Sequence, residues 1–276
     1  MIWQTSRFDI DLQRPRVMGI VNVTPDSFSD GGRHSSASAA LAHAEQLLRE
    51  GADILDIGGE STRPGAPAVS LEEELARVLP VVQGALAWGV PISVDTYKPE
   101  VMRAVLDAGA DIVNDVWALR QAGALEAVAA HPRCGMCLMH MHREPQTMQT
   151  EPMVGDVVPA VAAFLQTRAH TVQAAGVASE RIVLDPGIGF GKTVEQNFAL
   201  LAKQNALVCL GWPLLAGWSR KSSLGSVTGQ SVAADRVAAS VAAAVLALER
   251  GARVLRVHDV AATVQAAAVW RAAQAR

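Results

Sequence analysis

Eight short apolar runs recur along the chain, and stretches of helical composition rich in Ala, Leu and Glu separate most of them. Several helical stretches end at a glycine just before the next run, as in "EGAD", "AGAD" and "RGAR", and glycine commonly ends a helix. Strands that alternate with helices form parallel sheets, and eight such units predict a (β/α)8 barrel, a single domain spanning residues 1–276. The runs cover residues 16–23, 52–59, 91–96, 110–115, 135–140, 181–186, 213–219 and 252–259.

An open, doubly wound sheet is the alternative fold. No G-x-G-x-x-G pattern follows the first run, which disfavours a dinucleotide-binding version of that fold. Hydrophobic residues make up 50% of the chain and aromatic residues only 4%, so small aliphatic side chains must form the core, as suits helices packed on a buried parallel sheet. The net charge of −3 gives no indication of binding to nucleic acid or to a membrane surface.

Targeting and cysteine signals favour a cytoplasmic protein. The N-terminus has no apolar signal segment, and the longest apolar helical run, residues 237–248, is too short to span a bilayer. The chain has three cysteines, a small odd number that is typical of a reducing compartment. Cys134 and Cys137 form a C-x-x-C pair, but residues at i and i+3 of a strand point to opposite faces, so we predict core packing rather than a redox or zinc site.

Residues 185–193 read "DPGIGFGKT", and the last three letters resemble the end of a phosphate-binding P-loop. Pro186 stands where that loop needs its first glycine, and proline has no N–H to offer a phosphate. The carboxylate of Asp185 would also repel a phosphate. A P-loop nucleotide hydrolase is therefore disfavoured, and we predict a glycine-rich loop between a strand and a helix, with Asp185 as its functional group.

Polar side chains stand at the C-terminal end of nearly every predicted strand, which is the end of a (β/α)8 barrel where active sites form. A turn-forming residue would explain one such position but not all of them, so we predict one site for a polar ligand. Two glycine-rich loops, residues 24–32 and 58–66, are expected to close over it. The strand-end residues are Asn22, Asp56, Asp95, Asn114, His140, Asp185, Ser219, Arg220, Lys221, Arg256 and His258.

Cations at this end favour an anionic ligand. Arg256 and His258 are two residues apart and share one face of their strand, an arrangement that suits an anionic leaving group. A helix that begins near Ser222 would present free N–H groups to an anion. His140 and His142 have the same spacing and leave a metal site as an alternative, although the sequence provides no evident third ligand.

Five segments resemble the signatures of dihydropteroate synthase in order and spacing, and the match covers nearly the whole chain: "NVTPDSFSDGG" (22–32), "DIGGESTRPGA" (56–66), "DPGIGFGK" (185–192), "SRKS" (219–222) and "RVHDV" (256–260). The resemblance implies a (β/α)8 barrel of folate biosynthesis. Such an enzyme joins 4-aminobenzoate to a dihydropterin that carries a hydroxymethyl diphosphate, with Mg²⁺, and releases diphosphate. The resemblance also implies a homodimer.

Roles for individual residues follow from the same resemblance. It implies catalytic roles for Lys221, Arg63, Arg256, His258 and Asp30, the last orienting the amine or the metal. The implied pterin site consists of Asp95, Asn114, Asp185 and Lys221. The implied diphosphate site consists of Arg63, Arg256 and His258, with Asn22 next to Mg²⁺. The implied aminobenzoate site consists of Thr62, Phe28, Pro64, Phe190, Ser219 and Ser222.

One segment departs from the family pattern. After the fifth strand the family usually has a Gln-Gly pair, whereas "HMHREPQTMQ" has His142 and Arg143 there. The family pattern therefore does not predict the shape of this loop. A pterin-binding methyltransferase of the same fold is the alternative function. It would share the Asp and Asn contacts to pterin, but it would not need Arg63, the two glycine-rich loops or "SRKS".

Overall fold

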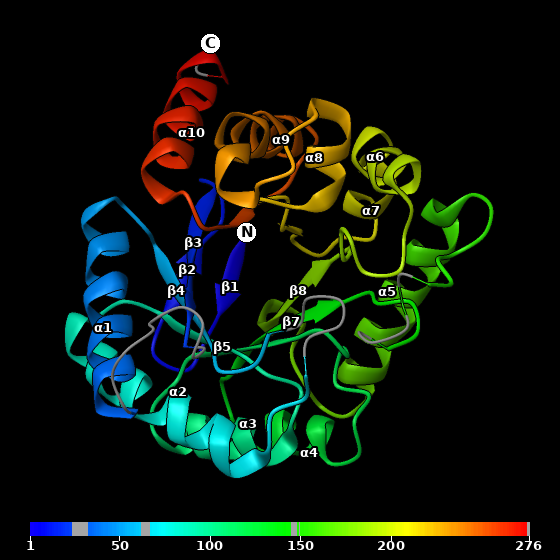
Figure 1. Ribbon diagram of the computed structural model, residues 1–276. Helices are drawn as coiled ribbons and strands as arrows, with labels where there is room; N and C mark the ends of the chain where they lie inside the picture. The colour runs from blue at the N-terminus through cyan, green and yellow to red at the C-terminus, as the bar shows by residue number, and fades with distance from the viewer. Residues whose placement is uncertain (24–32, 62–66, 145–147, 149, 275–276) are drawn as a thin grey trace.

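The computed structural model describes residues 1–23, 33–61, 67–144, 148 and 150–274, with the side chains of residues 33–35 left out. Eight parallel strands form its central sheet (Figure 1), in the order β8-β7-β6-β5-β4-β3-β10-β9. Each strand lies within one of the eight predicted runs. The bounds are β3 Arg16–Asn22, β4 Ile54–Gly58, β5 Ile92–Asp95, β6 Ile112–Asp115, β7 Gly135–Met139, β8 Ile182–Asp185, β9 Leu215–Ala216 and β10 Val254–Val257.

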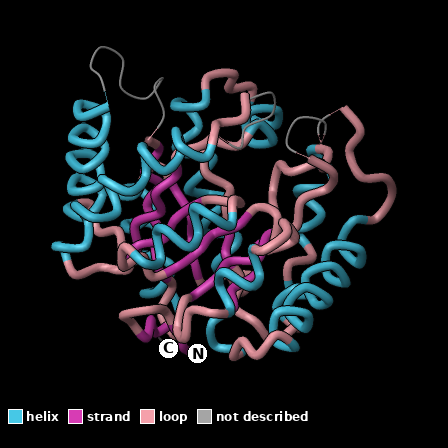
Figure 2. Tube along the Cα trace, turned by 90° about the horizontal axis from the view of Figure 1, so that it is seen from below, coloured by secondary structure: helices cyan, strands magenta, loops and turns pink. Residues whose placement is uncertain are grey.

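The sheet curls until its two edges meet. Leu184 of β8 forms a parallel bridge with Leu214, just before β9, and the Leu184 amide donates to the Pro213 carbonyl at 2.9 Å. The ring of strands is therefore closed, and the prediction of a (β/α)8 barrel is confirmed against the open sheet. Figure 2 shows the strands inclined across the centre of the molecule with helices around them.

Helices surround the ring, and most follow a strand directly. The glycines Gly51, Gly109 and Gly251 end α1, α3 and α9 with φ values of +101°, +108° and +94°, in the left-handed region that glycine tolerates. The bounds are α1 Arg33–Arg49, α2 Leu71–Ala85, η2 Leu86–Trp88, α3 Pro99–Asp107, α4 Ala124–Ala129, α5 Val157–Ala174, η3 Ser179–Arg181, α6 Val194–Ala202, α7 Asn205–Val208, α8 Ser222–Thr228, η4 Ala233–Arg236, α9 Val237–Glu249 and α10 Val260–Gln274.

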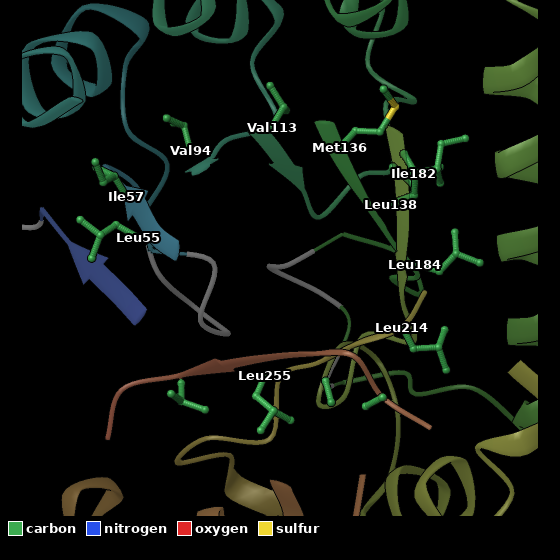
Figure 3. Packing of buried hydrophobic residues seen from close by; sticks show 14 of the residues in the cluster. Leu55, Ile57, Val94, Val113, Met136, Leu138, Ile182, Leu184, Leu214 and Leu255 are labelled. Atoms are coloured by element: carbon green, nitrogen blue, oxygen red, sulfur yellow. The ribbon is translucent and has the colours of Figure 1, made fainter. Parts of the chain in front are cut away.

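The larger part of the core lies between the strands and the helices. Figure 3 shows Leu55, Val113, Leu184 and Leu255 pointing away from the ring of strands, and all four are fully or almost fully buried. Because these strands are covered on both faces, their sequences are continuously apolar rather than alternating. Burial of apolar surface of this kind is the dominant favourable term in folding.

A second core fills the barrel interior and is covered at the N-terminal ends of the strands. The hairpin of β1 (Ile2–Gln4) and β2 (Asp9–Asp11) supplies Trp3 and Ile10 to this core. The Trp3 indole Nε1 donates to the Arg181 carbonyl at 3.1 Å. The sequence pattern did not predict this hairpin, since each strand has only three residues. It leaves the C-terminal end of the barrel for the site.

The C-x-x-C pair packs as predicted. Cys134 belongs to the core under the helices and Cys137 to the core inside the barrel, so the two thiols are buried on opposite sides of the sheet. Burial raises the pKa of Cys134 to about 12. In the described parts of the chain, no single helix is long and apolar enough to cross a bilayer. Helix 222–228 and segment 233–249 have the required length and apolar character only when they are taken together, and they are bent by 80° at the break between them.

Candidate active site

A cavity of about 330 Å³ lies at the C-terminal ends of the barrel strands. Sites of (β/α)8 enzymes form at this end. Around it lie Arg220, from the strand-end pattern, and ten of the fifteen residues to which the family resemblance assigns a role: Asn22, Asp95, Asn114, Asp185, Phe190, Ser219, Lys221, Ser222, Arg256 and His258. The other five predicted residues lie outside the residues that the structure describes: Phe28, Asp30, Thr62, Arg63 and Pro64.

The alternation of side chains along a strand explains why these groups converge. Arg256 and His258 are two residues apart at the end of β10, and both reach the cavity. Asp95 pairs with Asn114 across β5 and β6, so their side chains start from the same height in the barrel. Ile20 and Met139 enter the same cavity from β3 and β7 and add an apolar surface. The sequence pattern did not single out these two, because apolar strand residues are common.

Arg256 is held by two carboxylates. Its Nε donates to Asp56 Oδ2 and its Nη2 to Asp95 Oδ2, each at 2.6 Å. Burial raises the pKa of Asp95, while Arg256 acts in the opposite direction. Burial also opposes the charge of Arg256, but Asp56 and Asp95 outweigh this effect and raise its pKa. The guanidinium therefore stays charged at the cavity floor.

Asp56 organises this floor from below. It is fully buried and accepts hydrogen bonds from Ser93 Oγ at 2.6 Å and Asn114 Nδ2 at 3.2 Å, besides the bond from Arg256. The strand-end pattern included Asp56, but the family resemblance gave it no role. The signal was present in the sequence, since a carboxylate within the apolar run "ILDIG" must find partners when it is buried.

A second group of side chains gathers around Asp185 at the end of β8. The Gly187 amide donates to Asp185 Oδ1 at 2.7 Å, and Lys221 lies close enough to act on its charge. Burial raises the pKa of Asp185, while the Gly187 hydrogen bond and Lys221 lower it. Lys221 Nζ lies 4.4 Å from the centre of the Phe190 ring, a cation–π distance. A carboxylate, an ammonium and an aromatic face thus border one side of the cavity.

Ser219, after β9, and His258, after β10, form a pair at the cavity. The Ser219 hydroxyl lies 3.0 Å from His258 Nδ1, and the same oxygen accepts from the His258 backbone amide at 3.1 Å. Because the oxygen already accepts from that amide, its hydroxyl can donate to Nδ1, and the ring then carries its proton on Nε2. A donor of this kind suits an anion.

Two residues of the "GKT" segment, Lys192 and Thr193, stabilise the loop after β8 and the start of α6. Lys192 is buried, and its ammonium donates to the carbonyls of Gly187, Phe190 and His140 at 2.8, 3.1 and 3.4 Å. Thr193 caps α6 in a reciprocal arrangement with Gln196, each side chain bonded to the other's backbone amide. The lysine thus binds its own loop, which agrees with the prediction against a P-loop.

The two histidines after β7 do not form a metal centre in the described part of the chain. Across the described residues, no group of three or more His, Cys, Asp or Glu side chains could hold a metal ion. Burial, followed by the charge of Lys192, lowers the pKa of His140 to about 3, so this ring is neutral. Arg143 has a φ of +60° and forms an ion pair with Glu151; residues 145–147 and 149 of this loop lie outside the described chain.

Comparison with known families places the fold and the cavity in one class. A family model described as "Pterin binding enzyme" matches residues 18–258. This range begins at the third residue of β3 and ends at His258, so it includes the rest of β3, the other seven barrel strands and every predicted site residue. The chain is thus a pterin-binding enzyme built on a closed (β/α)8 barrel.

Individual relatives narrow the class further. A dihydropteroate synthase of Neisseria meningitidis serogroup B is 55% identical over 98% of this chain and 97% of its own length, and one of Escherichia coli is 48% identical over 95% and 93%. A Xanthomonas albilineans dihydropteroate synthase solved with 4-aminobenzoic acid superposes with a TM-score of 0.94, at 53% identity and full coverage of both chains. The same enzyme solved with 7,8-dihydropteroate gives 0.90, at 52% identity and 99% coverage of both. The chain belongs to the dihydropteroate synthase family, which confirms the resemblance.

Proposed function

We propose that this chain joins 4-aminobenzoate to (7,8-dihydropterin-6-yl)methyl diphosphate, giving 7,8-dihydropteroate and diphosphate. The observation that carries the proposal is one cavity that gathers carboxylates, an amide and cations, in a chain whose relatives above are dihydropteroate synthases. The solved relatives with 4-aminobenzoic acid and with 7,8-dihydropteroate support the same substrate and product. The methyltransferase alternative receives no support from these relatives.

The pterin end of the proposed site lies between Asp95, Asn114 and Asp185. A pterin edge carries adjacent N–H donors, and a carboxylate can accept two of them at once. An amide such as that of Asn114 both donates and accepts, which suits the mixed edge of the ring. Lys221 would donate to the ring carbonyl oxygen and nitrogen, and its contact with Phe190 keeps the ammonium at the cavity wall.

The diphosphate end of the proposed site contains Arg256, His258 and, from outside the described residues, Arg63. Fixed cations and N–H donors stabilise the charge that develops on a departing diphosphate without reorganising during the reaction. Arg256 still has N–H groups beyond the two that bind Asp56 and Asp95, because a guanidinium has five donors.

The described residues at this end fit Mg²⁺ bound mainly through the substrate. Mg²⁺ keeps few protein ligands in such sites and is completed by phosphate oxygens and water, which agrees with the absence of a group of three His, Cys, Asp or Glu ligands among the described residues. Asn22, at the end of β3, offers a hard amide oxygen beside the cavity. When bound, Mg²⁺ would neutralise charge on the leaving diphosphate.

We infer a dissociative order of events. Diphosphate leaves first, and the amine of 4-aminobenzoate then attacks the methylene carbon of the pterin-stabilised cation and loses a proton. Water would compete as a nucleophile, so its exclusion is required. Phe190, Ser219 and the Ser222 amide at the start of α8 would border the aminobenzoate, the amide binding its carboxylate.

We also propose a cytoplasmic homodimer. Four apolar side chains on segment 222–274 are exposed, namely Val227, Val232, Leu246 and Val269, and a second copy could cover them. Free cysteines are compatible with a reducing compartment. A monomer mass in light scattering at micromolar concentration would contradict the dimer.

Turnover of the purified protein tests the function. With both substrates and Mg²⁺, we expect diphosphate release that depends on 4-aminobenzoate, with 7,8-dihydropteroate identified by mass spectrometry. Lys221→Ala should abolish binding of the pterin diphosphate in calorimetry, whereas the matched surface variant Lys203→Ala should keep the wild-type affinity. Release of diphosphate that does not depend on 4-aminobenzoate would contradict the assignment, and so would an unchanged affinity of Lys221→Ala for the pterin diphosphate.

A further inference from the structure

Arg220, between Ser219 and Lys221, has an unusual backbone. Its φ is +59°, in the left-handed region that side chains other than glycine, asparagine and aspartate seldom adopt. Such a conformation persists only where the surrounding structure holds it, and positions of this kind cluster at functional sites. Its two neighbours, Ser219 and Lys221, both line the cavity. The backbone conformation of Arg220 therefore determines the position of the Lys221 backbone relative to the cavity.

Both peptide groups of Arg220 are tied to the start of α9. Its N–H donates to Ser240 Oγ at 2.9 Å, and the Ser240 hydroxyl donates to the Arg236 carbonyl at 2.7 Å. Arg236 Nη1 in turn donates to the Arg220 carbonyl at 2.9 Å. These three hydrogen bonds form a closed ring that holds the left-handed residue.

The side chain of Arg220 is tied to the neighbouring strand end. Its Nε and Nη2 donate to the two oxygens of Asp259 at 3.0 and 2.6 Å, a two-point arrangement that fixes distance and orientation together. Asp259 follows His258, whose ring contacts Ser219. The loops after β9 and β10 are therefore joined by two adjacent contacts, one at 219–258 and one at 220–259.

These contacts leave Arg220 with a positioning role. Its guanidinium borders the cavity and binds Asp259 at two points, so the ion pair fixes the loop after β9 to the loop after β10. We propose that Arg220 and Asp259 are positioning residues that hold Lys221 and the Ser222 amide at a fixed distance from His258. The proposal rests on the function inferred above, because those groups are the ones assigned to pterin, aminobenzoate and diphosphate.

The opposite end of the barrel provides a matched control. Arg16 Nη1 donates to Asp53 Oδ1 at 2.9 Å, and both side chains are partly exposed, as are those of Arg220 and Asp259. The Arg16 pair lies at the start of β3, far along the barrel from the cavity. Asp53→Asn and Asp259→Asn therefore each remove one carboxylate that pairs with an arginine, and only the second change acts on the loops of the site. Asp53 Oδ2 also accepts from the Val17 amide at 2.8 Å, a bond that the asparagine oxygen can still accept.

The test compares these variants in the full-length protein. For Asp259→Asn we expect the KM for 4-aminobenzoate to rise, and the affinity for the pterin diphosphate to fall, by about tenfold, since small displacements of positioned groups have effects of this size or larger. Asp53→Asn should stay within about twofold of wild type in both, as expected for a contact remote from the site. Urea titration of both variants measures the loss of stability that any broken ion pair causes.

A third variant separates the side chain from the backbone. Arg220→Gly adopts the left-handed conformation freely but loses the contact with Asp259, so it should be impaired like Asp259→Asn. Wild-type kinetics in Arg220→Gly, or equal effects of Asp259→Asn and Asp53→Asn, would overturn the proposal. If the wild type itself shows no turnover, the proposed function fails, while calorimetry with the pterin diphosphate still decides whether the pair positions Lys221.

Discussion

Replacing Lys192 with methionine tests how the loop after β8 is held. The lysine is buried beneath residues 187–190 and donates to three backbone carbonyls. Methionine keeps much of the length and apolar stem of the side chain but removes every donor. The His140 carbonyl would lose its lysine donor, and those of Gly187 and Phe190 would keep only backbone amides, from Phe190 at 3.1 Å and from His142 at 3.5 Å. The loss is costly because no water replaces the missing hydrogen bonds in a buried position.

The size of the effect follows from the three contacts. The bonds to Gly187 and Phe190 are 2.8 and 3.1 Å long, while the bond to His140 at 3.4 Å is weak. A hydrogen bond from a charged group contributes about 1.5–3 kcal/mol. Burial lowers the pKa of Lys192 to about 7, so removing the charge offsets part of this loss. We expect the free energy of unfolding to fall by about 3 kcal/mol, and Tm to fall by roughly 6–12 °C.

Urea and thermal unfolding at pH 7 measure this loss. Lys203→Met is the control, because Lys203 is half exposed and forms only a surface ion pair with Asp156 at 3.0 Å. Such pairs contribute at most about 1 kcal/mol, so the control should stay close to wild type. If Lys192→Met is as stable as Lys203→Met, the three hydrogen bonds do not hold the loop and the reasoning is wrong.

Two further predictions concern the same region. Because the folded protein binds a proton at His140 only near pH 3, while the unfolded chain does so near 6.5, the free energy of unfolding falls as the pH drops below 6.5. This residue should account for about 2 kcal/mol between pH 7 and pH 5, and His140→Phe should lack that part in urea titrations at the two pH values; equal losses in both proteins would contradict it. Gly187 and Gly89 have φ values of +67° and +65°, but an added Cβ would lie 1.8 Å from the His140 carbonyl oxygen at Gly187 and in open space at Gly89. Alanine should therefore cost about 1 kcal/mol at Gly89 and more than about 3 kcal/mol at Gly187, and similar midpoints in denaturant would rule out the clash.

Much of the barrel could be read from neighbouring residues alone. An apolar run followed by a helical stretch is a local signal, and so is a glycine at the helix end, as at Gly51 and Gly109. The hairpin of β1 and β2 was not predicted, because it lacks a local signal of this kind. Its strands are too short to show a pattern, and Trp3 is buried only because the barrel brings Arg181 and the inner core to it.

Some features of the candidate site were likewise predictable from the sequence, and others were not. The spacing of Arg256 and His258, and the place of Asp95 or Asp185 at a strand end, identify groups that meet once the strands form a ring. The sequence could not give Asp56 its place beneath Arg256, since the two residues are 200 positions apart. Nor could it give Arg220 its partner, Asp259, or its left-handed backbone.

By itself, the sequence determined the succession of strands and helices, the ends of the helices and the kinds of side chain carried to one rim of the barrel. Hydrophobic periodicity and chain-breaking residues act over a few positions, so they are legible in order along the chain. Only the tertiary structure decided which carboxylate holds which cation, and that Lys192 binds its own loop instead of a phosphate. Those choices depend on distances between remote segments and on burial, which makes each polar group seek a partner.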